Sequence, residues 1–290
     1  MNQRRRNVLP LNKVKVDDFF WNKYTRLVTD QIIPYQWEAL NDRVEDAEPS
    51  HCIKNFEIAA GLREGEFKGA VFQDTDLAKW LEAVAYSLAY EPDAELEKRA
   101  DAMIDLIGKA QQPDGYLDTY FIIKEPDKKF CNLREGHELY TAGHFMEAAV
   151  AYYQVTGKEK FLHIMQRVAD LICEVFHQEA FQQAVPGHEE VEIGLIRLYQ
   201  VTGERRYLEM AKDFVDTTVE PVVTYENGLL GGTDVIRLSG KRMDAEAWNS
   251  DVLYAEKRVP LKETDLTLVP YCYWGNRKTG EMQTWMKFLQ

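Results

Sequence analysis

The sequence predicts a mainly α-helical domain built from paired helices, followed by a small antiparallel β-domain. Three observations lead to this fold class. Apolar residues recur at helical spacing from about residue 17 to residue 216. A six-residue string repeats inside that region with a period of 46 residues. After residue 221 the apolar residues alternate in twos, which is typical of strands.

The composition is that of a folded globular protein. The chain has 290 residues, of which 45% are apolar and 29% charged, which excludes disordered and low-complexity classes. Its formal net charge of −13 argues against nucleic acid or anionic lipid as partners. No apolar run reaches the length of about 18 residues that a membrane helix needs, and the N-terminus has no apolar signal region. Four widely spaced cysteines fit reduced thiols, so we expect a cytoplasmic protein.

Each helix is predicted by its apolar stripe and its end signals. A stripe that includes Leu77, Trp80 and Leu81 predicts a helix over 76–90, and a second helix follows over 95–109 before a Pro and a Gly stop it. Further helices are predicted over 137–156, 158–176, 188–202 and 204–218, with weaker patterns over 18–45 and 50–61. Aromatic residues at helical spacing are expected in the core: Phe19, Phe20, Trp37, Trp80, Tyr152 and Tyr153.

The repeat indicates a helical hairpin. Residues 153–158 read YQVTGK and residues 199–204 read YQVTGE. The glycine can end one helix in the left-handed conformation, and the next helix then starts shortly after it. Periods in the forties suit an open solenoid or a closed ring of helix pairs, the α/α toroid. The long segment 112–136, with Tyr116, Tyr120 and Phe121, favours a closed ring with a long loop at its opening, because the connections in solenoids are usually short.

The last part of the chain is predicted to form the β-domain. Residues 234–240 and 265–274 alternate in hydropathy, and Gly231, Gly232, Gly240 and Gly275 separate the runs as turns. A last strand is expected near 282–288. We therefore expect two domains, a helical domain over 1–221 and a β-sandwich-like segment over 222–290.

Candidate polar residues gather at two helix starts. The string Gly-His-Glu occurs at 136–138 and again at 187–189, each time where the first helix of a hairpin begins. On the first of these helices His137, Tyr140 and His144 share a face at i, i+3 and i+7. In the alternative interpretation the glutamates complement the helix dipole while the histidines cap or pack. Both interpretations remain open at this point.

Other motifs indicate which kinds of ligand the chain could bind. Asp76 beside Trp80, and the QQPDGY string at 111–116, combine polar and aromatic groups as sugar sites do. Asp74 is interpreted as the N-cap of its helix. The string HEEVE at 188–192 has Glu where the zinc motif H-E-x-x-H needs its second His, so no metal site is predicted.

Taken together, these motifs resemble the β-L-arabinofuranosidase family, glycoside hydrolase family 127. The matching strings are FQDTD at 72–76, KWLEA at 79–83, QPDGYL at 112–117, HELY at 137–140, AGH at 142–144, GHEE at 187–190 and LVPYCYWGNR at 268–277. The resemblance implies an (α/α)6 barrel with β-sandwich accessories, and hydrolysis of arabinofuranosides of plant glycans. It also implies a carbohydrate ligand, with His137 and His188 lining the subsite that binds the sugar. We add His144 and Asp76 as candidate substrate-binding residues.

The chain departs from the family pattern in the second half of the barrel. There the resemblance implies a zinc ion held by a glutamate and cysteines, a cysteine nucleophile and a glutamate acid/base. This sequence has no Cys-Cys pair and no Glu-x-Cys, so no catalytic residue is assigned and Cys272 is not given the nucleophile's role. We expect an incomplete toroid with no cofactor in this chain, little turnover on its own, and self-association through exposed barrel edges. The alternatives are a non-catalytic sugar-binding module and a helical scaffold.

Overall fold

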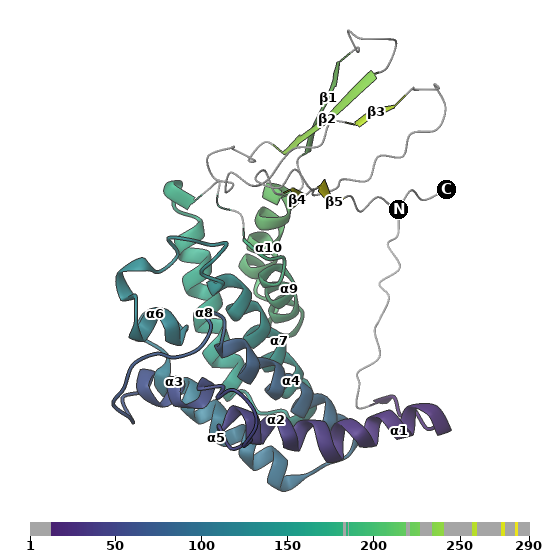
Figure 1. Cartoon of the computed structure of the whole chain (residues 1–290), viewed down its shortest axis with the longest axis vertical. Coiled ribbons are helices and arrows are strands. Elements are labelled where there is room, and N and C mark those ends of the chain that lie inside the picture. Colours follow the sequence, from purple (N-terminus) through teal and green to yellow (C-terminus); the bar gives the residue numbers. More distant parts are fainter. Residues whose placement is uncertain are drawn as a thin grey trace. The chain divides into compact units, whose positions relative to one another are not determined.

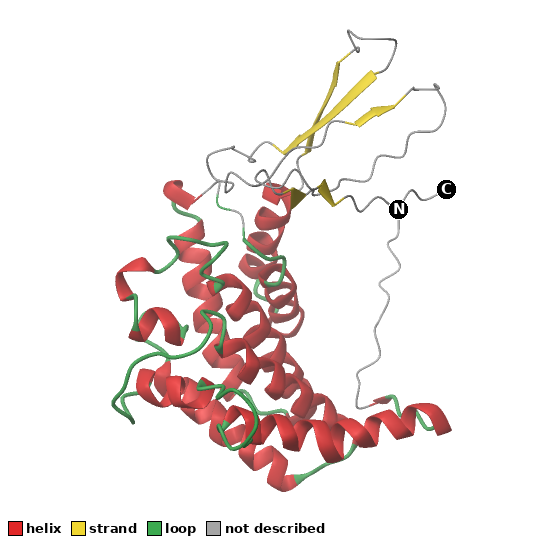
Figure 2. Cartoon of the chain, in the orientation of Figure 1, coloured by secondary structure: helices red, strands yellow, loops and turns green. Residues whose placement is uncertain are grey.

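A computed structural model of the chain describes residues 13–181, 184 and 186–218, together with five strand segments beyond them (Figure 1). The chain divides into two compact units, Met1–Phe214 and Val215–Gln290, which are described separately. The first unit is mainly helical (Figure 2). Within the described residues, none of its helices combines the length and the apolar composition needed to span a bilayer.

The predicted helices are confirmed, with ends that shift by a few residues, and one further helix, α6, was not predicted. The helices are α1 (Phe19–Leu27), α2 (Ile33–Leu40), α3 (Cys52–Ala59), α4 (Asp74–Tyr90), α5 (Ala94–Ala110), α6 (Thr119–Ile123), α7 (Glu138–Thr156), α8 (Lys160–Phe176), α9 (Val191–Thr202) and α10 (Arg205–Thr218). A π-helical turn, Val28–Ile32, joins α1 to α2, and short 3-10 turns cover Pro126–Lys128 and Glu179–Phe181.

These helices pack in two rows. Helices α2, α4, α7 and α9 are neighbours in one row, with the most extensive contacts between α4 and α7 and between α7 and α9. In the second row α5 contacts α3 and α8, and α10 packs on α8 through Phe176 and Phe214, whose ring centres are 5.2 Å apart. Consecutive helices of a hairpin therefore lie in different rows, which is the paired-helix arrangement that the repeat predicts.

The repeat ends both hairpin helices in the same way. Gly157 and Gly203 adopt the left-handed conformation, with φ of 74° and 77°. Each glycine N–H donates to the carbonyl oxygen four residues earlier. The hydroxyls of Thr156 and Thr202 also donate four residues back, both at 2.7 Å. The predicted Thr-Gly stop is thus confirmed in both copies.

The core contains Trp80 as its largest fully buried side chain. Its ring lies 4.9 Å from that of Trp37, and its Nε1 donates to the carbonyl oxygen of Ile33 at 3.2 Å. The expectation for Phe19 and Phe20 is wrong, because these side chains are 96% and 56% exposed. The reason is the position of α1, which projects beyond the other helices and has no buried residue (Figure 1).

The segment 112–136 differs from the predicted loop. It contains α6, and Tyr116 and Phe121 are buried, so these two rings contribute to the packing of the helical unit rather than to a loop at the opening of a ring. Asp74 is not the N-cap of α4, since Gln73 occupies that position. Instead its carboxylate accepts from the N–H of Thr119 at 2.7 Å and from the Thr119 hydroxyl at 2.6 Å. Asp74 therefore ties α6 to the start of α4.

The second unit contains five described strands. They are β1 (Pro221–Glu226), β2 (Asp234–Gly240), β3 (Lys257–Val259), β4 (Trp274–Gly275) and β5 (Met282–Gln283). β2 pairs antiparallel with β1 and β3, and β4 pairs antiparallel with β5. Most of 222–290, including Cys272, lies outside the described residues. The β-sandwich-like domain and its boundary after residue 221 therefore stay predictions.

Candidate functional site

The two Gly-His-Glu strings meet at the N-terminal ends of α7 and α9. The rings of His137 and His188 lie 4.5 Å apart, centre to centre, and are tilted by 33°. Gly187 makes this approach possible, because a Cβ at that position would lie 2.4 Å from the Cα of Arg134, just before His137. A residue with a side chain would push the two segments apart.

Tyr140 links the histidine pair to a third histidine. Its ring lies 5.1 Å from the ring of His188 and 4.5 Å from the ring of His144. Its hydroxyl is 3.0 Å from Nζ of Lys79, on the neighbouring helix α4. As the spacing predicts, the three residues of α7 share one face, and that face meets the segment before α9.

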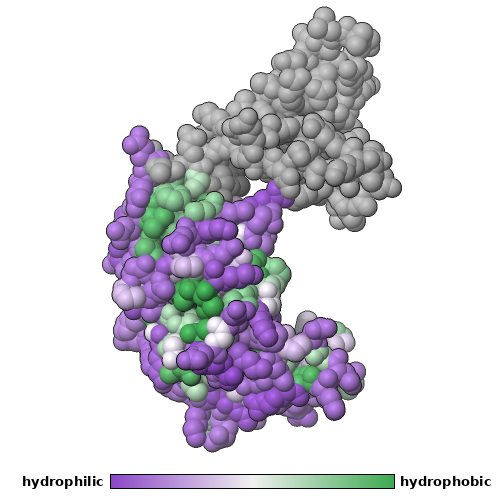
Figure 3. All heavy atoms as spheres, turned by 60° about the vertical axis from the view of Figure 1, so that its left-hand side comes forward, coloured by the Kyte–Doolittle hydropathy of each residue, from purple (hydrophilic) through white to green (hydrophobic). Residues whose placement is uncertain are grey.

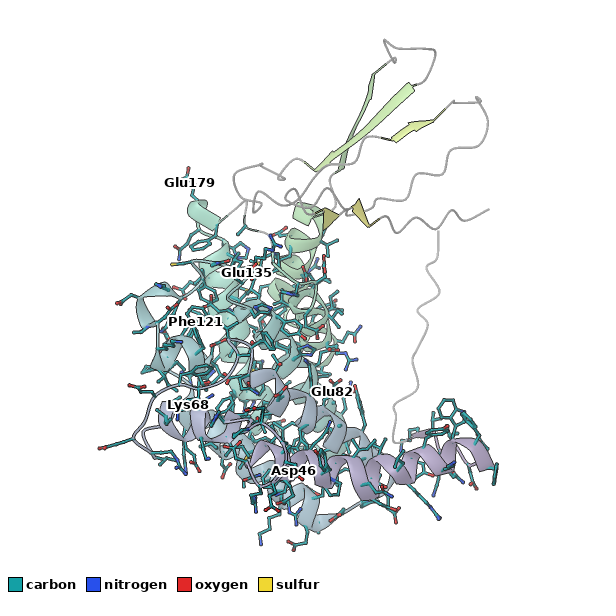
Figure 4. The ribbon with its side chains drawn as sticks, viewed as in Figure 1. Asp46, Lys68, Glu82, Phe121, Glu135 and Glu179 are labelled. Atoms are coloured by element: carbon teal, nitrogen blue, oxygen red, sulfur yellow. The ribbon has the colours of Figure 1, made fainter. Side chains whose placement is uncertain are left out.

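The backbone fixes the protonation pattern of His137. The residue is the N-cap of α7 with a left-handed φ of 56°, and its Nδ1 lies 2.8 Å from the carbonyl oxygen of Glu135, the residue labelled in Figure 4. Since a carbonyl oxygen only accepts hydrogen bonds, Nδ1 must carry a proton. In the neutral ring Nε2 is then an acceptor. The ring of Phe72 covers His137 at 5.0 Å.

Buried polar atoms without hydrogen-bond partners concentrate at this end of α7 and α9. Of the seven such atoms in the described residues, five lie here: Thr141 Oγ1, His144 Nε2, His188 Nδ1, Glu190 Oε1 and Glu192 Oε2. Each such atom costs about 1–3 kcal/mol when it stays unpaired. A concentration of this kind is typical of a region that binds a ligand or ordered water.

Acidic groups surround His144. Glu190 Oε1 lies 3.1 Å from His144 Nδ1, and Glu147 Oε1 lies 2.8 Å from Nε of Arg197. Burial lowers the pKa of His144 to about 4, and the charge of Lys79 acts in the same direction. Burial raises the pKa of Glu147 to about 7, with a further contribution from Glu190. His144 is therefore uncharged at neutral pH.

Asp76 lies at the edge of this region. It is an exposed residue in the first turn of α4, where its carboxylate accepts from Nε2 of Gln73 at 2.6 Å. Lys79 follows one turn later and contacts Tyr140. Burial raises the pKa of the Asp76 carboxyl, and the charge of Lys79 lowers it less strongly. Asp76 is thus connected to the histidines electrostatically through Lys79, which contacts Tyr140.

Sequence reasoning missed a buried carboxylate cluster behind the histidine pair. Glu138, 3% exposed, accepts from the hydroxyl of Tyr116 and from the N–H of Phe130. Burial raises the pKa of Glu138 to about 7. Nearby, Asp118 caps α6 and has one oxygen without a partner. Because Glu138 follows His137 directly, these bonds position the start of α7.

Two open surface pockets lie elsewhere in the helical unit. One, of about 470 Å³, is lined by residues of α2, α3 and α5, and the other, of about 410 Å³, by residues of α5 and α8 with Gln111. Neither includes His137, His144, His188 or Asp76. The histidine group is therefore identified by its ring contacts and unpaired atoms, not by a cavity.

Comparisons with known proteins agree on one family. A model described as the β-L-arabinofuranosidase GH127 catalytic domain matches residues 13–255. The non-reducing end β-L-arabinofuranosidase of Bifidobacterium longum subsp. longum is 41% identical over 220 residues, which are 70% of this chain and 33% of that protein.

Solved structures give the same result. The GH127 β-L-arabinofuranosidase from Geobacillus stearothermophilus T6 superposes with a TM-score of 0.69 at 57% identity, over 70% of this chain and 32% of that one. A second GH127 β-arabinofuranosidase superposes with a TM-score of 0.65 at 34% identity, over 72% and 33%. The chain thus spans about a third of the length of the relatives it matches.

Proposed function

The chain belongs to the GH127 β-L-arabinofuranosidase catalytic-domain family, and on that basis we propose that its helical unit binds a terminal arabinofuranosyl group of plant glycans. The main support for this proposal is the close approach of His137 and His188, whose ring centres lie 4.5 Å apart. One ring offers Nε2 and the other a buried Nδ1 without a partner. A few convergent polar atoms beside aromatic rings are what a sugar site requires.

The surrounding residues suit a neutral, hydroxyl-rich ligand. A sugar hydroxyl both donates and accepts, so it can pair with an acceptor on one ring and a donor on the other. Phe72 and Tyr140 offer ring surface to the C–H face of the sugar. His144 and Asp76 extend the site in this proposal, His144 beside Tyr140 and Asp76 at the start of α4.

We further propose that the chain alone hydrolyses arabinofuranosides poorly or not at all. A retaining glycosidase needs a nucleophile and an acid/base on two sides of one bond. Burial raises the pKa of the Cys173 thiol to about 11, and raises that of Cys52 far above its ordinary value. Glu138 has a suitable pKa but is shielded from any substrate by its own hydrogen bonds and burial.

A thiolate-held zinc ion does not fit the described residues. The described cysteines, Cys52, Cys131 and Cys173, are free thiols, and none of them belongs to a group of three or more metal-ligating side chains there. The wide spacing of the four cysteines along the sequence supports a cytoplasmic location as part of this proposal. In the same proposal the helical unit is part of an incomplete toroid.

One experiment tests binding and turnover together. We expect arabinose to bind the wild-type chain weakly, and His137→Ala to reduce its affinity about tenfold, as the loss of one good hydrogen bond does. His163→Ala, at an exposed position on α8, is the control and should bind like the wild type. Titration calorimetry measures both. Release of arabinose from an aryl β-L-arabinofuranoside should stay near background, with or without added zinc.

The possible outcomes separate the alternatives. Robust zinc-dependent turnover would overturn the proposed loss of catalysis but not the binding site. Equal affinity of the wild type and His137→Ala for arabinose would contradict the proposed binding site, and the chain would then be better interpreted as a helical scaffold.

Self-association is expected from the exposed aromatic side chains of α1. Phe20, Trp21 and Tyr24 are 56%, 55% and 44% exposed, and Figure 3 shows apolar patches on the otherwise hydrophilic surface of the helical unit. Contiguous exposed apolar surface favours association. Sedimentation velocity should show concentration-dependent oligomers that Trp21→Glu weakens. Gln31→Glu, which adds the same charge at an exposed polar position, should not. A single monomeric species at all concentrations would contradict this expectation.

A further inference from the structure

A second group of ligating side chains lies beyond the histidine pair, one turn further along α7 and at the start of α9. We propose that His144, Glu147 and Glu190 bind a divalent transition-metal ion. Each side chain offers one ligand atom, and these atoms all lie within 4.8 Å of one another. In the part of the chain that the structure describes, no other group of three or more His, Cys, Asp or Glu side chains meets this condition.

Rigid elements hold the three residues. His144 and Glu147 are spaced i, i+3 on α7 and so project from one face. Glu190 is the N-cap of α9. Gly143 lets that segment approach, because a Cβ on Gly143 would lie 2.6 Å from the carbonyl oxygen of Glu190. Sites held by packed helices keep their geometry better than sites on free loops.

Two of the three proposed ligand residues have a buried polar atom without a hydrogen-bond partner among the described residues. Glu190 Oε1 lies 3.1 Å from His144 Nδ1, yet that oxygen and His144 Nε2 are both buried and neither makes a hydrogen bond with the described residues. A cation bound to the imidazole and the carboxylate would give Glu190 Oε1 the partner that it lacks.

The local charge also favours a cation. Two carboxylates lie within 4.8 Å of each other, and Arg197 pairs with only one of them, through Nε at 2.8 Å from Glu147 Oε1. Lys79, a further cation near His144, is bonded to the hydroxyl of Tyr140. The second carboxylate, on Glu190, contacts the imidazole of His144 at 3.1 Å, so a cation bound there would be attracted by both acidic side chains.

The ligand set indicates the class of ion. One imidazole with two carboxylates is typical of Zn²⁺, Mn²⁺ and Fe²⁺, whereas Ca²⁺ and Mg²⁺ prefer oxygen ligands alone. The side chains are 12–16% exposed, so an ion can reach them and water can complete its coordination. This oxygen and nitrogen set contains no thiolate, and the proposal does not depend on sugar binding.

The test is a titration of the metal-stripped full-length chain with Mn²⁺. Mn²⁺ prefers oxygen and nitrogen to thiolate, which keeps the exposed Cys131 out of the measurement. Unbound Mn²⁺ is counted from its electron paramagnetic resonance signal, and Zn²⁺ is then titrated in by calorimetry. We expect one tight site per chain. Glu190→Gln should weaken it at least tenfold, since even residues that only support a ligand are worth about 10–100-fold in metal affinity.

Glu189→Gln is the matched control. It removes the same charge from the neighbouring, exposed residue and should bind Mn²⁺ like the wild type. Without metal, Glu190→Gln should melt no lower than the wild type, because it removes one of two facing charges. If that variant fails to fold, His144→Asn replaces it, with His163→Asn as its control. Absence of a tight site in the wild type, or equal binding by Glu189→Gln and Glu190→Gln, would overturn the proposal.

Discussion

Gly143→Ala should destabilise the helical unit by about 2–3 kcal/mol, the upper part of the range for overpacked cores. The alanine Cβ would lie 2.6 Å from the carbonyl oxygen of Glu190, closer than real contacts allow. Gly194, on α9, has the same constraint from the other side, since its Cβ would lie 2.9 Å from the carbonyl oxygen of Gly143. Both obstacles are backbone atoms, so α7 and α9 would have to separate.

Gly108→Ala provides the matched comparison. Gly108 also lies inside a helix, but its Cβ would meet only the end of the flexible Ile164 side chain, at 3.0 Å. Alanine gains about 1 kcal/mol of helix propensity over glycine, which offsets a small adjustment of that side chain. Urea unfolding followed by circular dichroism measures both variants. Equal losses of unfolding free energy would show that the α7–α9 crossing is not as close as described.

Glu138 should make the protein less stable as the pH rises from 5 to 8. Burial raises its pKa from an ordinary value of 4.5 to about 7. Between these values the folded state retains a proton that the unfolded state has released. The stabilisation is therefore fully present below pH 4.5 and is lost as the pH rises through about 7. At 1.36 kcal/mol per pKa unit, the loss between pH 5 and 8 is about 2–3 kcal/mol.

Comparison with Glu138→Gln isolates this effect. We expect the unfolding free energy of the wild type to fall by about 2–3 kcal/mol more than that of the variant between pH 5 and 8. Glu135→Gln changes an exposed glutamate of the same segment and should keep the wild-type pH dependence. Parallel pH profiles for the wild type and Glu138→Gln would contradict the prediction. Asp74 and Asp118, whose pKa values burial also raises, act in the same direction, and the charge of Glu138 contributes to the shift of Asp118.

The helical hairpins could be predicted because their signals are local. An apolar stripe depends on neighbours within two turns, and the Thr-Gly stop depends on bonds within four residues. The face shared by His137, Tyr140 and His144 follows from helical spacing alone. The meeting of His137 with His188 could only be suggested, by the recurrence of Gly-His-Glu.

The errors concern contacts between distant segments. Asp74 has the sequence of an N-cap, but the N–H and hydroxyl of Thr119 bind it more directly than its own helix does. Phe19 and Phe20 have core periodicity, yet that pattern does not say whether any element covers the helix. The ligand group containing Glu190 was missed because its members come from two helices and form no short motif.

The identical Thr-Gly caps of α7 and α9 have a consequence for how such chains change during evolution. Each cap is completed by atoms of its own helix and the residue after it, so it does not depend on which hairpin follows. A duplication, loss or exchange of a whole hairpin could therefore join the chain at these turns without leaving a frayed helix end. The apolar sides of the neighbouring hairpins would then decide whether the new arrangement folds.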